Sequence, residues 1–150
     1  MHDLEVEALA PDHLQSGVRV SVASIAWTMV SSDGGIGMRH PRGAGTFPRV
    51  LGRFVRERKW LSLEEAVRKM TSLTASRLKL TDRGTLKKGV WADLVLFDPA
   101  TVIDRSTYED ASIPSAGIPT VIIAGQAVVD GGTVTAARPG RAIRAPIAAR

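Results

Sequence analysis

The chain has 150 residues, 44% of them hydrophobic and 23% charged, and this composition excludes a disordered or fibrous protein. Its 20 Lys and Arg residues against 15 Asp and Glu residues give a formal net charge of +5, which permits an anionic partner without requiring one. Because the chain has no cysteine, disulfides, cysteine-based zinc sites and thiol nucleophiles are excluded.

The first residues are acidic and polar and lack the basic start and apolar run of a secretory leader, so we expect a cytoplasmic protein. The most apolar run, residues 18–30, spans about 13 residues, fewer than the roughly 20 that cross a bilayer, and we expect no membrane partner. A short polar helix is predicted over residues 4–16. Apolar and polar residues then alternate, which predicts at least one strand within 18–30 that stops at residues 31–35.

Asp33 is the first candidate site residue, because it directly follows this apolar run and precedes two glycines that allow a sharp turn. A carboxylate at the carboxyl end of a barrel strand is able to bind a metal and to accept a proton from water, as the general base of a hydrolase does. The spacing alone favours the simpler interpretation that the Asp-Gly-Gly sequence is a plain turn.

The following loop contains two further candidates, Arg42 and His40. A guanidinium matches a carboxylate in a two-pronged pair, so Arg42 is a candidate for binding the carboxylate of a substrate. The local alternative is a solvated basic loop. His40 precedes Pro41, and a lone histidine in such a position more often caps a helix or makes a single hydrogen bond.

A helix is predicted over residues 47–58, with Thr46 as its N-cap and Pro48 in its first turn. Its apolar face is formed by residues at helical spacing, Phe47, Val50, Leu51, Phe54 and Val55. Three arginines fall on the outer side, Arg49, Arg53 and Arg56. The two nearby phenylalanines lie on the apolar face, so we interpret the basic residues as a solvated helix face and expect no nucleic-acid partner.

A second helix is predicted over residues 63–78, because Ser62 and Glu65 have the spacing of a capping box. The sequence then changes from α-helical to β character. Two stretches rich in β-branched residues predict strands. They are residues 90–98 and residues 120–130, the second folding back as a hairpin at residues 124–126.

Three stretches resemble a known family: SSDGG, RHPRGAGTFPRVLGRFVRE and LSLEEAVRKMTSLTASRLKLTDRGTLKKGVWADLVLFDP. From about Ser31 to Gly140 the chain resembles the C-terminal third of N-acyl-D-amino-acid deacylases, the D-aminoacylase branch of the amidohydrolase superfamily. The segment RGTLKKGVWADLVLFD is shared across the superfamily, whereas SDGG together with HPRGAGTFPR indicates this branch.

The resemblance implies an α/β fold, the C-terminal fragment of a metal-dependent (β/α)8 amidohydrolase barrel plus part of its small β domain. In this interpretation residues 1–84 hold the last strand and helices of the barrel, residues 85–135 belong to the small β domain, and residues 136–150 form a basic tail. By the same resemblance Asp33 corresponds to the aspartate that assists the metal and acts as general base and then general acid. Arg42 and His40 then belong to the loop that meets the carboxylate side of the substrate.

The resemblance also implies zinc for the complete enzyme. The family's other metal ligands are an early His-x-His pair, a bridging cysteine or its equivalent and two later histidines, and these have no counterparts here. The chain's own histidines, His2, His13 and His40, are widely spaced. Since a catalytic zinc uses about three protein ligands, we expect Asp33 to bind metal only together with ligands absent from this chain.

The sequence therefore predicts part of a zinc-dependent hydrolase that cleaves the amide of N-acyl-D-amino acids. We expect the isolated chain to bind no zinc and to be inactive. Three explanations stay open: a truncated gene product, a mis-set start codon at Met1, or a complementary chain as a partner that supplies the rest of the barrel. Two alternatives from other classes are a non-catalytic remnant or interaction module and a basic nucleic-acid binder.

Overall fold

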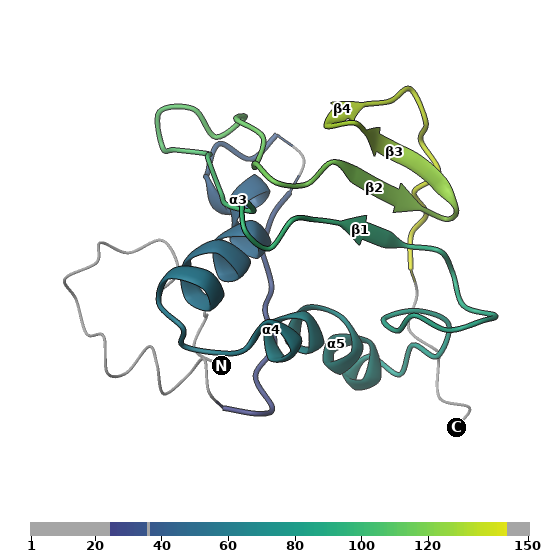
Figure 1. Cartoon of the computed structure of the whole chain (residues 1–150). Helices are drawn as coiled ribbons and strands as arrows, with labels where there is room; N and C mark the ends of the chain where they lie inside the picture. Colours follow the sequence, from purple (N-terminus) through teal and green to yellow (C-terminus); the bar gives the residue numbers. More distant parts are fainter. Residues whose placement is uncertain (1–24, 36, 144–150) are drawn as a thin grey trace. The chain divides into compact units, whose positions relative to one another are not determined.

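The computed structural model describes residues 25–35 and 37–143 (Figure 1). It combines helices with one antiparallel sheet, which agrees with the predicted mixture of α and β structure. The chain divides into two compact units, Met1–Met70 with Asp98–Gly117 and Thr71–Phe97 with Ile118–Arg150. In the described ranges no helix is both long enough and apolar enough to cross a membrane.

In the first unit, helix α3 (Arg42–Arg49) continues directly as the π-helix η1 (Val50–Glu57). The predicted helix therefore exists, but it begins earlier than residue 47 and Thr46 is not its N-cap. Thr46 lies inside α3, and its Oγ1 donates a hydrogen bond of 2.9 Å to the Arg42 carbonyl. The Thr46 hydroxyl therefore makes a hydrogen bond inside the helix and does not cap its start.

Pro48 lies inside α3, where the prediction placed it in the first turn. Proline has no backbone N–H, so the Ala44 carbonyl loses its helical donor. The Oγ of Ser115 donates a hydrogen bond of 3.2 Å to that carbonyl and replaces the missing bond. Because Ser115 is 71 residues away in the chain, no local pattern indicates that the helix tolerates an internal proline.

The buried hydrophobic side chains of the first unit are contributed by η1, by the helix over residues 63–70 and by the later segment. They include Val50, Leu51, Ala66 and Val102. Phe47, which the sequence placed on the apolar face, is 39% exposed. The reason is that α3 is buried through smaller residues, Gly45, Thr46 and Pro48.

The prediction that the three helix arginines lie on an outer, solvated face was wrong for Arg49, whose side chain is 19% exposed, whereas the side chains of Arg53 and Arg56 are 41% and 30% exposed. Arg49 Nη1 donates a hydrogen bond of 3.2 Å to Asp104 Oδ2, and Arg53 Nε lies 3.7 Å from the other oxygen of the same carboxylate. Arg56 Nη1 donates to the Val102 carbonyl at 2.7 Å. The segment Asp98–Gly117 covers this side of the helices, so the arginines pair within the unit instead of forming a basic surface.

The described part of the apolar run, residues 25–30, contains a turn at residues 26 and 27 and no strand, which corrects the strand prediction for this part. No strand lies beside it among the described residues of the first unit, and a strand needs such a neighbour for its backbone bonds. The backbone N–H of Val30 instead donates to the Lys69 carbonyl at 3.4 Å. The helix predicted over 4–16 and the start of the apolar run, 18–24, lie outside the described residues.

Helix α4 (Leu63–Met70) begins where the capping-box spacing predicts, because the backbone N–H of Glu65 donates to Ser62 Oγ at 3.2 Å. The predicted helix does not run unbroken to residue 78. Thr71, with φ of −133° and ψ of −89°, separates α4 from α5 (Ser72–Arg77).

The second unit holds the sheet, whose neighbouring strands are all antiparallel. They are β1 (Leu94–Leu96), β2 (Thr120–Ile123), β3 (Gln126–Asp130) and β4 (Thr133–Val134), in that order. The predicted hairpin is confirmed. Its turn residues Ala124 and Gly125 have φ of 49° and 79°, the positive values of a type I′ turn.

Strand β1 is shorter than the predicted strand over 90–98. The N–H of Trp91 donates to the Asp82 carbonyl at 2.9 Å, and the Ala92 carbonyl accepts from the N–H of Gly125 at 3.0 Å. The backbone before β1 is thus bonded to a loop and to the hairpin turn, which ends the ladder early.

Candidate active site

Asp33 is exposed and lies where the backbone changes direction. The change is made at Asp33 itself, whose φ is +43°, and neither Gly34 nor Gly35 has a positive φ. Aspartate is one of the few residues that tolerate this region. Ser31 and Ser32 stabilise the arrangement, because their hydroxyl oxygens accept hydrogen bonds from the backbone N–H groups of Asp33 and Gly34.

The role of Gly34 is to allow a close approach to the start of α3. A Cβ on this residue would lie 3.2 Å from the Cα of Gly43 and 3.0 Å from Ser32 Oγ, both tight contacts. The segment that bears Asp33 therefore packs directly on the first turn of the helix that bears Arg42.

Asp33 and Arg42 form an ion pair, with 2.6 Å between Asp33 Oδ2 and Arg42 Nη2. The Asp33 side chain is 64% exposed and the Arg42 side chain 25%. Arg42 Nε is buried and has no hydrogen-bond partner among the described residues. Two candidates that the sequence proposed separately are thus in direct contact, with the carboxylate on the solvent side.

His40 lies beside this pair and caps the start of α3. Its Nδ1 accepts a hydrogen bond of 3.1 Å from the backbone N–H of Arg42. Its ring packs edge-on against Tyr108, with 5.0 Å between the ring centroids and 81° between the planes. This geometry fits the capping alternative and fixes the ring next to the backbone of Arg42.

The later segment of the first unit holds the start of α3 in place. Ser106 Oγ donates a hydrogen bond of 2.9 Å to the Pro41 carbonyl. A Cβ on Gly45 would lie 2.8 Å from Ser106 Oγ and 3.1 Å from the Cβ of Asp104, so only glycine fits between them. Sequence analysis did not find these supporting residues, and no local signal marks them.

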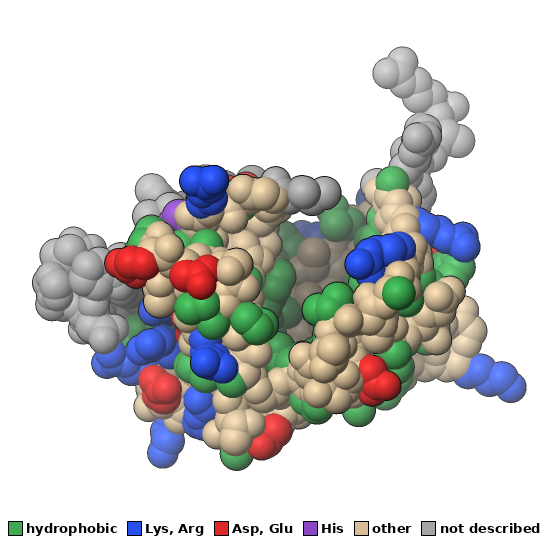
Figure 2. Space-filling view, turned by 90° about the horizontal axis from the view of Figure 1, so that it is seen from above, with side chains coloured by type: hydrophobic (Ala, Val, Ile, Leu, Met, Phe, Trp, Pro, Cys, Tyr) green, Lys and Arg blue, Asp and Glu red, His purple; other side chains and the backbone are tan. Residues whose placement is uncertain are grey.

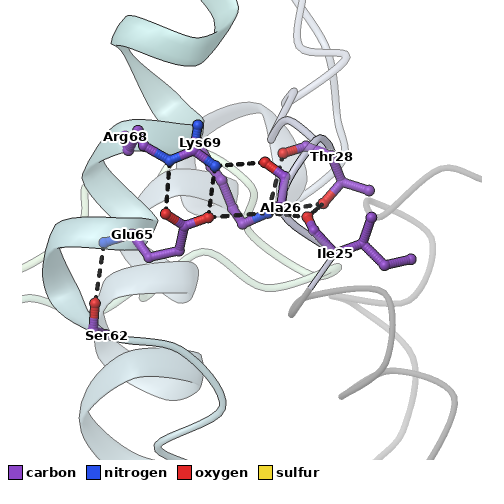
Figure 3. A network of polar contacts seen from close by, with 7 residues as sticks. All are labelled: Ile25, Ala26, Thr28, Ser62, Glu65, Arg68 and Lys69. Carbon is purple, nitrogen blue, oxygen red and sulfur yellow. Dashed lines mark hydrogen bonds and ion pairs between the residues drawn. The ribbon is translucent and has the colours of Figure 1, made fainter.

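A network of polar contacts on α4 binds the segment that precedes Asp33 (Figure 3). Lys69 is only 1% exposed, and its Nζ donates to the carbonyls of Ile25 and Thr28. Arg68 donates to both carboxylate oxygens of Glu65 at 2.7 and 2.8 Å. These hydrogen bonds from Arg68 lower the pKa of Glu65 to about 2. Burial of the ammonium lowers the pKa of Lys69, and the nearby charge of Glu65 opposes that effect.

The charges on one face of the surface are mixed. Figure 2 shows one face, on which Lys and Arg side chains alternate with Asp and Glu and with exposed hydrophobic side chains. On the described part of this face no continuous patch of one sign is visible. This face therefore carries no basic stripe of the kind that the nucleic-acid alternative needs.

A cavity of about 440 Å³ lies within the second unit. Its lining includes Arg83, Trp91 and Arg141, and the Arg141 guanidinium lies 5.5 Å above the Trp91 ring. Asp33, His40 and Arg42 do not line it.

Along residues 25–35 and 37–143, no group of three or more potential metal-binding side chains comes together. Asp33 is one carboxylate, and its contact is a guanidinium. A zinc site of three or more protein ligands therefore does not fit the described residues by themselves. His2 and His13 lie outside the described residues.

Residues 26–129 match the model of a family described as the amidohydrolase family. Two curated relatives come from Alcaligenes xylosoxydans xylosoxydans. N-acyl-D-glutamate deacylase is 49% identical over 118 residues, which are 77% of this chain and 24% of the relative. D-aminoacylase is 47% identical over the same shares of the two chains. The chain thus spans about a quarter of the length of the curated relatives it matches.

Solved structures agree with these similarities. A D-aminoacylase with a binuclear metal center superposes with a TM-score of 0.74 at 44% identity, over 79% of this chain and 26% of that chain. N-acyl-D-glutamate deacylase from Bordetella bronchiseptica, solved with zinc and a phosphonate inhibitor, superposes with a TM-score of 0.64 at 46% identity, over 69% and 23% of the two chains.

Proposed function

The chain belongs to the amidohydrolase family, and from this premise we propose that it supplies Asp33 and Arg42 to the active site of an N-acyl-D-amino-acid deacylase. The observation that carries the proposal is the 2.6 Å ion pair between these residues. Both belong to the narrow sequence motifs SDGG and HPRGAGTFPR. The similarity to N-acyl-D-glutamate deacylase, N-acyl-D-aspartate deacylase and D-aminoacylase supports the substrate class.

In this proposal Asp33 is the general base. Its carboxylate is exposed and therefore accessible to a water molecule, from which it accepts a proton as the water attacks the amide carbonyl. The protonated carboxyl then donates that proton to the amide nitrogen as the C–N bond breaks. Arg42 contacts this carboxylate, with 2.6 Å between Arg42 Nη2 and Asp33 Oδ2.

Arg42 also provides the proposed contact to the carboxylate of the substrate. A guanidinium carries five N–H donors, and the ion pair with Asp33 joins Arg42 Nη2 to the carboxylate oxygen Oδ2. His40 stabilises the backbone at Arg42 through its Nδ1 and is the proposed third contact on the carboxylate side.

Zinc is proposed for the complete enzyme, because zinc is bound by the Bordetella bronchiseptica relative. The described residues do not form its site, so the proposal includes a complementary part of the amidohydrolase that brings the remaining ligands. In the proposed enzyme this chain contributes the end of the barrel and part of the small β domain, with 1–84, 85–135 and 136–150 as its divisions.

The test is a chimera in which this chain replaces the matching quarter of D-aminoacylase. We expect the purified chimera to bind zinc and to hydrolyse N-acetyl-D-amino acids, whereas the isolated chain does neither. Asp33→Ala should abolish turnover in the chimera and leave its oligomeric state unchanged. Asp130→Ala, which removes an exposed aspartate of β3, is the matched control and should retain activity. A zinc-loaded chimera that does not hydrolyse would contradict the proposed function, and near-normal turnover without Asp33 would contradict the role of this residue.

A further inference from the structure

Lys69 is a buried cation that the proposed chemistry does not use. It lies in α4, is 1% exposed and has three near acceptors on the segment before Asp33. Nζ lies 2.5 Å from the Ile25 carbonyl, 3.2 Å from the Thr28 carbonyl and 3.0 Å from Thr28 Oγ1. An ammonium has three donor hydrogens, and these three acceptors lie within hydrogen-bond distance of it.

The neighbouring residue of α4 extends this contact. Arg68 Nη2 donates to the Ala26 carbonyl, and the Lys69 carbonyl accepts from the N–H of Val30. Figure 3 shows both cations of α4 pointing toward the turn formed by residues 25–28. Side chains of α4 thus bind backbone carbonyls of this turn. In a sheet, a neighbouring strand would bind such carbonyls.

Burying a charged side chain costs free energy that burying an apolar side chain of the same size does not. Moving an ammonium out of water is unfavourable unless hydrogen bonds and an opposite charge compensate it. Glu65 supplies the opposite charge, with its Oε1 3.6 Å from Nζ. An uncharged side chain such as methionine would fill the same space without this cost, but it could not hold three acceptors in fixed positions.

Residues 25–30, which are bound to α4, lead directly to Asp33. Only two serines separate Val30 from this residue, and the chain then reaches the ion pair with Arg42. We propose that Lys69 is a positioning residue for Asp33, because it fixes the backbone of residues 25–30 on α4 and thereby sets where the following carboxylate meets Arg42. The catalytic role of Asp33 at this position rests on the proposed function, but the placement of its backbone by Lys69 does not.

The first experiment compares Lys69→Met with Lys87→Met, which removes an exposed lysine of the second unit. Hydrogen exchange of the backbone amides in the whole chain is followed by NMR. In Lys69→Met we expect the amides of Val30, Asp33 and Gly34 to exchange about tenfold faster or more, since charge-assisted hydrogen bonds are lost. The amides of η1 should keep their rates, as should all of these amides in the control. Unchanged exchange at Asp33 and Gly34 in folded Lys69→Met would overturn the proposal.

A chemical rescue separates the ammonium from the shape of the side chain. The chain has no cysteine, so Lys69→Cys introduces a single thiol. Alkylation of the unfolded variant with bromoethylamine, followed by refolding, restores an ammonium at nearly the original length. Iodoacetamide gives a neutral adduct as the control. We expect only the aminoethylated protein to recover the exchange rates that the unmodified chain has at Val30, Asp33 and Gly34, and equal behaviour of the two adducts would contradict a role for the charge.

Thr28→Val is the milder variant that decides the matter if Lys69→Met does not fold. It removes one acceptor of the ammonium and retains the carbonyls. We expect faster exchange at Asp33 in the same direction and to a smaller extent, whereas exchange identical to the unmodified chain would refute the positioning role. None of these measurements uses turnover, so an inactive chimera leaves their outcome unaffected.

Discussion

The ion pair between Asp33 and Arg42 joins two residues with different proposed tasks. The two side chains are 2.6 Å apart, and in the proposed enzyme Arg42 is both the partner of the base and the contact for a substrate carboxylate. A substitution of Arg42 therefore affects binding through a lost charge-assisted pair, whereas a substitution of Asp33 affects the chemical step.

For Arg42→Ala in the chimera we expect KM for an N-acetyl-D-amino acid to rise about thirtyfold, which corresponds to about 2 kcal/mol. Arg42→Lys should recover only part of this loss, because an ammonium lacks the planar fork of the guanidinium. Arg39→Ala, an exposed arginine of the same loop, is the control and should leave KM unchanged. Steady-state kinetics measure these values, and an unchanged KM in Arg42→Ala would count against the contact.

Glu65 gives the stability of the first unit a defined dependence on pH. Its pKa is lowered from the ordinary value of 4.5 to about 2, chiefly by the hydrogen bond from Arg68. A carboxyl with a lower pKa in the folded chain stabilises that chain above the unfolded pKa, and this contribution is lost as the pH falls toward the folded pKa. We expect the free energy of unfolding to decrease more steeply between pH 4.5 and 2 in the unmodified chain than in Glu65→Gln.

Urea titrations at stepped pH measure this difference. Glu57→Gln, which changes an exposed glutamate of η1, should follow the unmodified chain. Parallel pH curves for the unmodified chain and Glu65→Gln would show that the Arg68 contact does not stabilise the fold.

At the scale of single residues, sequence reasoning found the candidates that lie near one another in the chain. Asp33 and His40 precede α3, Arg42 is its first residue, and the structure brings the three together. Lys69 and Asp104 were not found. Their partners are 44 and 55 residues away, so their burial depends on contacts that no local pattern encodes.

The π-helix η1 packs closely against the later segment of the first unit. A Cβ on Gly52 would lie 2.4 Å from Ile103 Cδ1 and 2.6 Å from the Val102 carbonyl oxygen. The second contact is with backbone, which cannot move aside as a side chain can. The glycine is therefore required by proximity and not by its backbone conformation.

Gly52→Ala should lower the free energy of unfolding by about 1–3 kcal/mol, the usual range for overpacking. Gly43→Ala is a matched control in α3, where the nearest atom to the added carbon is 3.7 Å away. That variant should gain about 0.5–1 kcal/mol, since alanine favours a helix over glycine. Chemical denaturation measures both values, and equal effects of the two substitutions would contradict the packing argument.

The elements that could be predicted are those with local signals. The start of α4 follows from Ser62 and Glu65, and the hairpin of β2 and β3 follows from its turn residues. The early start of α3, the short β1 and the absence of a strand in residues 25–30 depend on distant partners. For α3 that partner is Ser115, which compensates for Pro48.

For the whole molecule, the sequence motifs predict the family, and the match over residues 26–129 confirms it. The part of the chain that the structure describes does not supply a complete metal site, because no three potential ligands come together there and about three are needed. The division into two units, one of which is built from separate stretches of chain, could not be predicted, since local patterns do not report which segments return to one another.

This discontinuous first unit has a consequence for synthesis on the ribosome. The helices bearing Arg49 and Arg53 leave the ribosome before the carboxylate of Asp104, which is 55 residues behind Arg49. At about 5–20 residues per second, this interval lasts about 3 to 11 seconds. During it the nascent helices carry cations without their carboxylate and an apolar face without Val102, so the first half of the chain completes its fold only after most of the second half has been translated.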